Sequence, residues 1–236
     1  MAENFLSKYL AASFDKKSSA DDKKGLVVTI SRQKGCGAYP IANLLIDKLN
    51  DLKYPYGKRV PWKLISKEIM EESAGKLKMK PALIDPLLNK YGKSVFNEII
   101  LSLTHQSLPG DIKIKNTIRS VIENAASEGN IIIIGRGGVS ITRNYRNSLH
   151  IRLEAPLDWR IKVIAKNENI SLQEAEKIVK ERDLERSALK LYFLGKTTTD
   201  HHIYDLVINV STMDQAEIAE AIFSIVKLRQ DMRLSR

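Results

Sequence analysis

The sequence predicts an α/β fold with a mainly parallel sheet, because short β-branched runs alternate with segments of helical periodicity. Four isoleucines in succession occupy residues 131–134, a run too apolar for an exposed strand and suited to the middle of a parallel sheet. The chain has 236 residues, of which 43% are hydrophobic, so it is long enough for one large domain or for a domain with an insertion.

The expected elements follow one another regularly after residue 25. Strands are expected at residues 26–30, 131–134, 149–153 and 204–210. Helices are expected at residues 41–49, 64–74, 83–88, 95–108, 112–128, 157–168 and 214–233. A further long helix opens at Ser171, which forms an S-x-x-E capping box with Glu174. Because residues 53–129 are helical with little strand signal, we expect an insertion or a substrate-side subdomain there.

The first 24 residues are expected to stand apart from the main domain, residues 25–236. Residues 4–14 are amphipathic and predict an appended helix that docks on the body of the protein or on a partner. A polar linker of mixed charge follows it. The oligomeric state stays open, with a homo-oligomer as one option.

Charge and composition restrict the partners of the chain. Thirty-eight Lys and Arg against 28 Asp and Glu give a net charge of +10, which favours an anionic partner, either a phosphorylated small molecule or nucleic acid. Nucleic acid is disfavoured, because the basic residues are scattered and the aromatic residues form no interleaved stacking series. The chain has no apolar run of membrane-spanning length, no signal-peptide pattern and a single cysteine, so we expect a cytoplasmic protein without a membrane partner.

The loop after the first strand has features of a phosphate-binding loop. Its sequence, SRQKGCGAYP at residues 31–40, joins a strand to a helix, so that backbone N–H groups and the positive end of the helix dipole meet at one spot. Gly35 and Gly37 let the backbone curl round a phosphate. The Walker A pattern G-x-x-x-x-G-K-[ST] is absent, because A-Y-P follows Gly37 instead of a lysine and a hydroxyl. A tight strand-to-helix connection without a ligand is the alternative for this stretch alone.

Arginines stand where the carboxyl ends of parallel strands would hold a ligand. Arg32 lies in the first loop, Arg136 directly follows the isoleucine run in IIIIGRGG, and Arg160 lies on the helix after the third strand. The segment KERDLERSALKLYF adds Arg182, Asp183 and Arg186. Arginine suits phosphate because its planar fork donates two parallel hydrogen bonds and stays charged. A solvated charged face is the alternative for that last segment.

In their order and spacing, these stretches resemble the cytidylate-kinase-like family of P-loop nucleoside monophosphate kinases, here with a degenerate Walker A loop. The resemblance runs from residue 27 to roughly residue 225 and is carried by VVTISRQKGCG, IIIIGRGG, LHIRLEAPLDWRIKVI, KERDLERSALKLYF and YDLVINVS. It implies a three-layer P-loop NTPase fold with a mainly parallel sheet, a helical monophosphate-binding insertion at residues 53–129 and a lid at about residues 180–203.

The resemblance also implies an activity, which is ATP-dependent phosphoryl transfer to a nucleoside monophosphate, with ATP and Mg²⁺ as cofactors and nucleotides as partners. The implied catalytic residues are Arg182, Asp183 and Arg186. Arg136 and Arg160 would hold the acceptor monophosphate. The ATP phosphates would meet Arg32, Lys34, Gly35, Cys36 and Gly37. No metal ligand is assigned.

A second hypothesis stays open, namely a catalytically silent nucleotide-binding or regulatory module, because the Walker A lysine and hydroxyl are missing. Two smaller features are interpreted as structural. Cys36 is expected to be a packed cysteine in preference to a reactive one. His201 and His202 are adjacent, so their side chains point apart and make a poor metal chelate.

Overall fold

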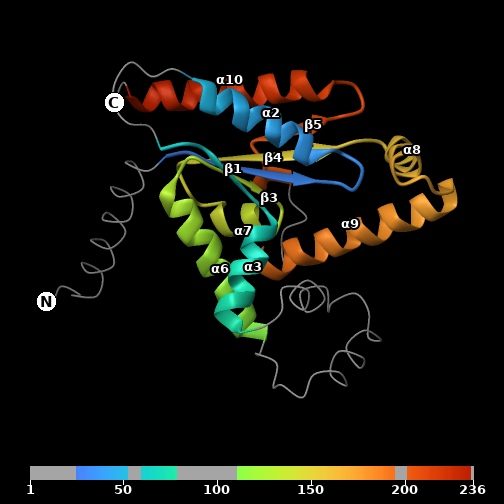
Figure 1. Cartoon of the computed structure of the whole chain (residues 1–236), viewed down its shortest axis with the longest axis horizontal. Helices are drawn as coiled ribbons and strands as arrows, with labels where there is room; N and C mark the ends of the chain where they lie inside the picture. Colours follow the sequence, from blue (N-terminus) through green and yellow to red (C-terminus); the bar gives the residue numbers. More distant parts are fainter. Residues whose placement is uncertain (1–24, 53–59, 79–110, 195–200, 235–236) are drawn as a thin grey trace, which may run out of the picture.

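The computed structural model describes residues 25–52, 60–78, 111–194 and 201–234 (Figure 1). The strands in these ranges are β1 (Val27–Arg32), β2 (Lys63–Ile65), β3 (Ile131–Ile134), β4 (Ser148–Glu154) and β5 (Leu206–Asn209). The helices are α2 (Ala38–Asp51), α3 (Lys67–Leu77), α6 (Asp111–Glu128), α7 (Gly138–Thr142), α8 (Leu157–Glu168), α9 (Leu172–Leu194) and α10 (Gln215–Leu234). A 3₁₀ turn, η2 (His201–Ile203), precedes β5.

The described strands form one sheet in the order β2-β3-β1-β4-β5, and every neighbouring pair is parallel. The central strand β1 pairs with β3 from Val27 opposite Ile131 to Ile30 opposite Ile134. Because β1, β3 and β4 run in the same direction, their carboxyl ends meet at one edge of the sheet. This is the edge at which open α/β sheets hold their ligands.

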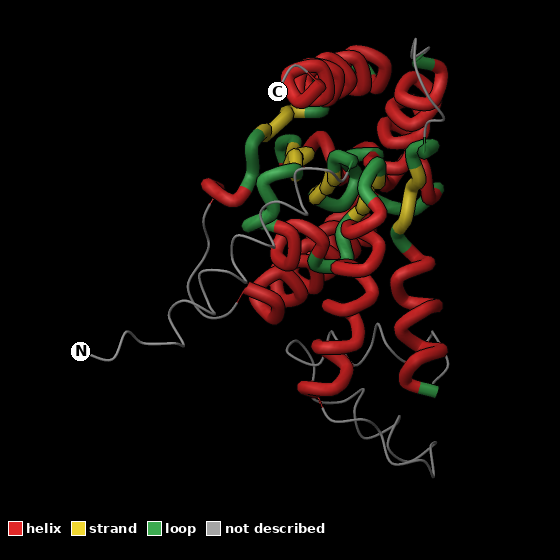
Figure 2. The backbone as a smooth tube through the Cα atoms, turned by 90° about the vertical axis from the view of Figure 1, so that its left-hand side faces the viewer, coloured by secondary structure: helices red, strands yellow, loops and turns green. Residues whose placement is uncertain are grey.

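Helices cover both faces of the sheet and make three layers (Figure 2). Val28, Ile30 and Ile132 belong to the core that includes the buried residues of α2 and α10. Their neighbours Val27 and Ile131 belong to the core that α3 and α6 close on the opposite face. The alternation follows from the two-residue period of a strand, and it explains why these strands are apolar on both sides. The helix α8 lies beyond the carboxyl ends of the strands, and α9 runs from it back towards α7, where Phe193 joins the core of α3 and α6; together these two helices are called the arm (Figure 1).

The expected α/β fold with a parallel sheet is confirmed, but one stretch was assigned wrongly. Residues 64–74 were expected to form a single helix, whereas Lys63–Ile65 form β2 and the helix α3 begins only at Lys67. Leu64 pairs with Ile132 of β3, and the Ser66 backbone N–H donates to the Glu68 carboxylate, which fixes the change of direction. A strand of three residues is too short to show a period of its own.

The long helix α9 runs without a break to Leu194, so residues 180–194 of the expected lid are helical. Its capping box is formed as expected, since the Ser171 backbone N–H donates to Glu174 and the Glu174 N–H donates to the Ser171 hydroxyl. The helices expected at residues 83–88 and 95–108 and the appended helix at residues 4–14 lie outside the described residues. No helix in the described part of the chain is long and apolar enough to cross a membrane.

Candidate phosphate-binding site

The loop between β1 and α2 is held in a tight curl against α8. Gly35 and Gly37 both have positive φ, 96° and 59°. A Cβ atom on Gly35 would lie 3.1 Å from Cβ of Arg160 and 3.2 Å from its carbonyl oxygen. Glycine is therefore required at residue 35 for both its conformation and the close approach of α8. Gly37 directly precedes the first turn of α2, as a strand-to-helix phosphate loop requires.

Arg160 and Asp183 connect this loop to the arm. The Arg160 side chain is only 6% exposed, and it donates to the Ala155 and Lys34 carbonyl oxygens and, over 2.5 Å, to Oδ2 of Asp183. The other carboxylate oxygen of Asp183 accepts a hydrogen bond of 2.7 Å from the Lys34 backbone N–H. A buried charge needs a paired partner, and Asp183 is the partner of Arg160. Because both side chains also bind the backbone of Lys34, they join the loop after β1 to α8 and α9.

The turn between β3 and α7 brings Arg136 to the same edge of the sheet. Gly135, Arg136 and Gly137 have successive positive φ angles of 67°, 54° and 78°. The left-handed conformation is costly for arginine, and such residues often occur at functional sites. A Cβ atom on Gly135 would lie 1.9 Å from Nη1 of Arg32. The glycine therefore leaves the space that the Arg32 guanidinium occupies.

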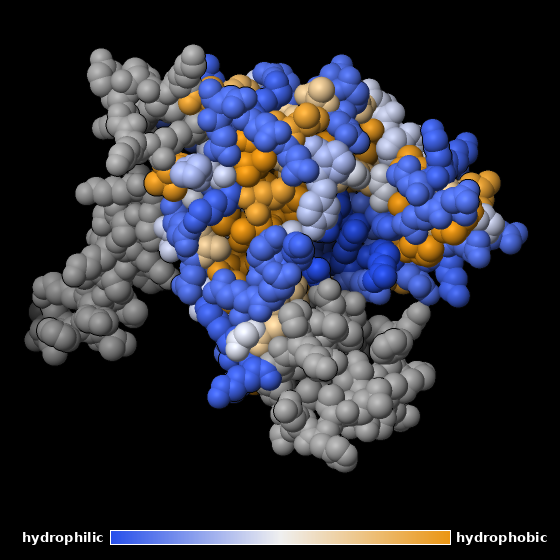
Figure 3. Space-filling view, viewed as in Figure 1, coloured by the Kyte–Doolittle hydropathy of each residue, from blue (hydrophilic) through white to orange (hydrophobic). Residues whose placement is uncertain are grey.

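Between the sheet and α9 lies a pocket lined by five cationic side chains and one carboxylate. The cations are Arg32, Arg136, Arg152, Arg186 and Lys190, and the carboxylate is Asp183. The remaining lining residues are Ser31, Gly135, Gly137, Val139, Ser140, Ser187, Leu189 and Tyr204. Figure 3 shows strongly hydrophilic side chains in the hollow between the body of the protein and the arm. The pocket is therefore an electropositive cavity at the ligand edge of the sheet. We call it the arginine pocket.

Burial and mutual repulsion make the charged form less favourable for several cations of the arginine pocket. Burial, and then the repulsion of Arg186, lowers the pKa of Arg32 to about 10. Burial also lowers the pKa of Arg186, although Asp183 acts in the opposite direction. Burial and the charge of Arg152 lower the pKa of Lys190. Desolvated like charges gain from a bound anion, so the pocket is prepared to accept oxyanions such as phosphate.

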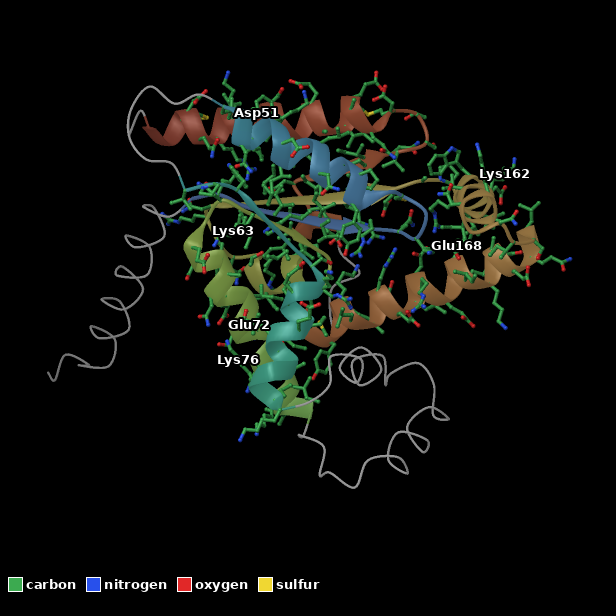
Figure 4. The ribbon with its side chains drawn as sticks, in the orientation of Figure 1. Asp51, Lys63, Glu72, Lys76, Lys162 and Glu168 are labelled. Carbon is green, nitrogen blue, oxygen red and sulfur yellow. The ribbon has the colours of Figure 1, made fainter. Side chains whose placement is uncertain are left out.

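The structure brings together Arg32, Arg136, Asp183 and Arg186 in the lining of the arginine pocket. The side chain of Lys34 turns away to an ion pair of 2.8 Å with Glu168, the last residue of α8, which is labelled in Figure 4. Arg182 is 58% exposed and pairs with Glu185 on the surface of α9. Arg160 lies beneath the loop and is not among the residues that line the pocket.

The structure also gives the surroundings of Cys36 and Lys63. Cys36 is a packed residue of the core, 3% exposed, and burial raises its pKa to about 11, as expected of an unreactive thiol. Lys63 pairs with Glu128 over 2.8 Å on the β2 side of the sheet (Figure 4). Across the described residues there is no group of three or more His, Cys, Asp or Glu side chains that could hold a metal ion.

Sequence reasoning missed Arg152, Lys190 and Tyr204 as pocket residues. Arg152 is the one charged residue inside the apolar run LHIRL, and that contrast is a usable signal. Lys190 lies four residues after Arg186 and seven after Asp183, so the helical period places all three on one face. Nothing in the local sequence marks Tyr204 as a pocket residue, because its position depends on the fold of the segment before β5.

The model of the cytidylate kinase-like family matches residues 27–212, which is most of the chain. The chain belongs to this family.

Curated cytidylate kinases match part of the chain. The enzyme of Pyrococcus horikoshii is 37% identical over 107 residues, which cover 45% of this chain and 53% of that enzyme. The enzyme of Methanopyrus kandleri is 35% identical over 122 residues, 48% of this chain and 60% of that enzyme. The chain thus matches little more than half the length of these relatives.

A crystal structure of an uncharacterized protein from Eubacterium ventriosum shares the fold. It has a TM-score of 0.61 and 19% sequence identity, and the superposition covers 86% of this chain and 99% of the other. The likeness supports the α/β architecture alone.

Proposed function

We propose that this member of the cytidylate kinase-like family transfers a phosphoryl group from ATP to a nucleoside monophosphate. The observation that carries the proposal is the arginine pocket, with five cations beside the β1–α2 loop at the carboxyl ends of β1, β3 and β4. Two phosphate-bearing substrates must meet with their negative charges close together, and fixed cations offset that repulsion. The proposal includes a cytoplasmic location, and a homo-oligomer is still compatible with it.

The β1–α2 loop and Arg32 are proposed to hold the ATP phosphates. The backbone N–H groups of Gly35 and Gly37, next to the start of α2, are proposed as the donors, because the Cys36 N–H already donates to the Gln33 carbonyl over 3.3 Å. No Cys36 side-chain chemistry is needed, because the thiol is buried. The side chain of Lys34 can reach the phosphates only after it leaves Glu168. An exposed ion pair of this kind costs at most about 1 kcal/mol to break.

Arg136 and Arg186 are proposed to face the acceptor monophosphate and the transferring phosphoryl group. They project from the β3–α7 turn and from α9, so the pocket between them is bounded by two separate elements. A well-placed arginine on the transferring group is worth about 10³ to 10⁵ in rate. Arg182 is proposed to join them only when the arm closes, since it now pairs with Glu185.

Arg160 is proposed as a positioning residue of this site. It was expected on the acceptor phosphate, but its donors are directed to two carbonyl oxygens and to Asp183. From that position it fixes the loop and holds the Asp183 carboxylate, which in turn faces Arg186 at 3.9 Å. Its effect on the reaction would therefore pass through the loop.

ATP and Mg²⁺ fit this site to different degrees. The loop and the arginines suit the phosphates of ATP. The carboxylate that lines the pocket, Asp183, is already bound by Arg160 and by the Lys34 N–H. The described residues therefore do not form a dedicated magnesium site, and the ion would have to arrive with the phosphates of ATP.

The test is ADP release from magnesium-ATP in the presence of a panel of ribo- and deoxyribonucleoside monophosphates. We expect turnover that depends on one monophosphate, falls by about 10³ or more in Arg186→Gln, and falls less in Arg182→Gln. Lys180→Gln is the matched control, because it removes a cation from the same helix that pairs with Glu176 on the exposed surface. Turnover that is independent of the monophosphate, or equal in all variants, would contradict the proposal.

A second candidate is a nucleotide-binding module without turnover. The observation that favours it is the sequence A-Y-P after Gly37, which lacks the lysine and the hydroxyl that a Walker A loop brings to the phosphates and to magnesium. Saturable ATP binding, without ADP release at high enzyme concentration, would establish this function instead.

A further inference from the structure

The arginine pocket continues past the residues assigned so far. Arg152 projects from β4 into it, Lys190 faces it from α9, and Tyr204 closes it from the segment before β5. The roles proposed above for the β1–α2 loop and for Arg136 do not involve any of these three residues. They lie together, because the Arg152 guanidinium stacks 5.8 Å from the centre of the Tyr204 ring and its charge lowers the pKa of Lys190.

The Tyr204 hydroxyl is a buried polar group without a partner. Within the part of the chain that the structure describes, this oxygen makes no hydrogen bond. A buried hydroxyl without a hydrogen bond is unfavourable, and a ligand that accepts from it recovers that cost. The side chain that supplies this donor lines a pocket rich in cations, so an anionic acceptor is the group that it suits.

The charges around the cavity also favour an anionic ligand. Arg152 donates to the Glu154 carboxylate over 2.9 Å, and Asp183 is bound by Arg160. The lining of the cavity thus holds five cations and one carboxylate, with Glu154 beside Arg152. Lys190 therefore adds positive charge next to Arg152, beyond the cations proposed for ATP and for the acceptor.

We propose that Arg152, Lys190 and Tyr204 form a second oxyanion subsite, so that the arginine pocket takes a ligand with two neighbouring oxyanion groups. The stacked Arg152 and the ammonium of Lys190 would bind the second group, and the Tyr204 hydroxyl would donate to it. This subsite rests on the proposed function, because that function identifies the ligand as a substrate. The substrate would bear a second phosphoryl or carboxylate group. Anion binding itself can be measured without any transfer.

The test is calorimetric titration of the full chain with inorganic phosphate, pyrophosphate and 2-phosphoglycolate. We expect pyrophosphate or phosphoglycolate to bind about ten-fold more tightly than phosphate, as one additional charge-assisted contact predicts. Pyrophosphate reports a second phosphoryl group and phosphoglycolate a carboxylate, so their ranking identifies the second group. Equal affinity for all three anions would overturn the proposal, as would failure of all three to bind.

Two single-residue variants locate the effect. Tyr204→Phe removes only the hydroxyl and keeps the ring under Arg152, and Lys190→Gln removes one charge. Each is expected to lower the affinity for the double anion while phosphate binding stays within about two-fold. Lys180→Gln, on the exposed side of the same helix, is expected to change neither. A parallel loss for phosphate and for the double anion would overturn the subsite, and the result does not depend on whether any monophosphate is phosphorylated.

Discussion

The Asp183 carboxylate accepts a hydrogen bond of 2.7 Å from the backbone N–H of Lys34, although 149 residues separate the two in the chain. This contact attaches the arm to the loop that follows β1. Because Arg160 binds the same carboxylate, the loop is held by a charged pair and not by the loop sequence alone. The position of the loop therefore depends on α8 and α9.

Asp183→Ala is predicted to destabilise the protein by about 2 kcal/mol. The change leaves the Arg160 guanidinium, 6% exposed, without its carboxylate partner. Asp183→Asn keeps an acceptor for the Lys34 N–H and is expected to lose about half as much. Urea unfolding measures both. Glu185→Ala, which breaks the exposed pair with Arg182, is the control, with an expected loss below about 0.5 kcal/mol. Similar losses for Asp183→Ala and Glu185→Ala would contradict the assigned role.

Arg136→Gly is predicted to separate activity from stability. Arg136 has a φ of 54°, which glycine adopts without strain, so the free energy of unfolding is expected to stay equal or to rise by up to about 1 kcal/mol. Phosphoryl transfer is expected to fall by about 10³, because the cation is lost. Lys78→Gly is the matched control, since Lys78 has a φ of 55° at the end of α3 and lies outside the pocket lining. Equal activity in the two variants would show that Arg136 has no role in transfer.

The sequence predicted the fold better than the site, and the reason is physical. The isoleucine run and the alternating helices carry hydrophobic periodicity, so the sheet could be predicted from local patterns. Pocket membership depends on which face of an element meets another element, and this is a tertiary property. Arg160 and Arg186 are similar in sequence context, yet one lies beneath the loop and the other lines the pocket. The strand β2 was not predicted, because it is defined by its pairing with β3 and its own short sequence shows no strand pattern.

Cys36 is predicted to react slowly with thiol reagents in the folded protein. The side chain is 3% exposed, and its pKa of about 11 leaves almost no thiolate at neutral pH. Because the chain has one cysteine, a single labelling curve reports this residue alone. We expect slow labelling at pH 7.5 and complete, rapid labelling in denaturant. Rapid stoichiometric labelling of the folded protein would place the thiol at the surface of the loop.

His150 is predicted to make stability depend on pH below about 6.5, the ordinary pKa of an exposed histidine. In the folded protein its ring is buried between the hydroxyls of Thr29 and Ser148, and burial lowers its pKa, against the opposing effect of Asp205 and with a smaller contribution from Arg229. A lowered folded pKa means that the unfolded chain binds more protons between the two pKa values, so stability is fully present above about pH 6.5 and is lost as the pH falls towards the folded value.

The measurement is the free energy of unfolding in urea between pH 4.5 and 7.5 for the wild type and for His150→Gln. Glutamine keeps polar partners for Thr29 and Ser148 but takes up no proton. We expect the variant to lose less stability than the wild type as the pH falls, by up to about 1.4 kcal/mol for each pH unit between the two pKa values. Parallel curves for the two proteins would mean that His150 binds its proton as readily in the folded protein as in the unfolded chain.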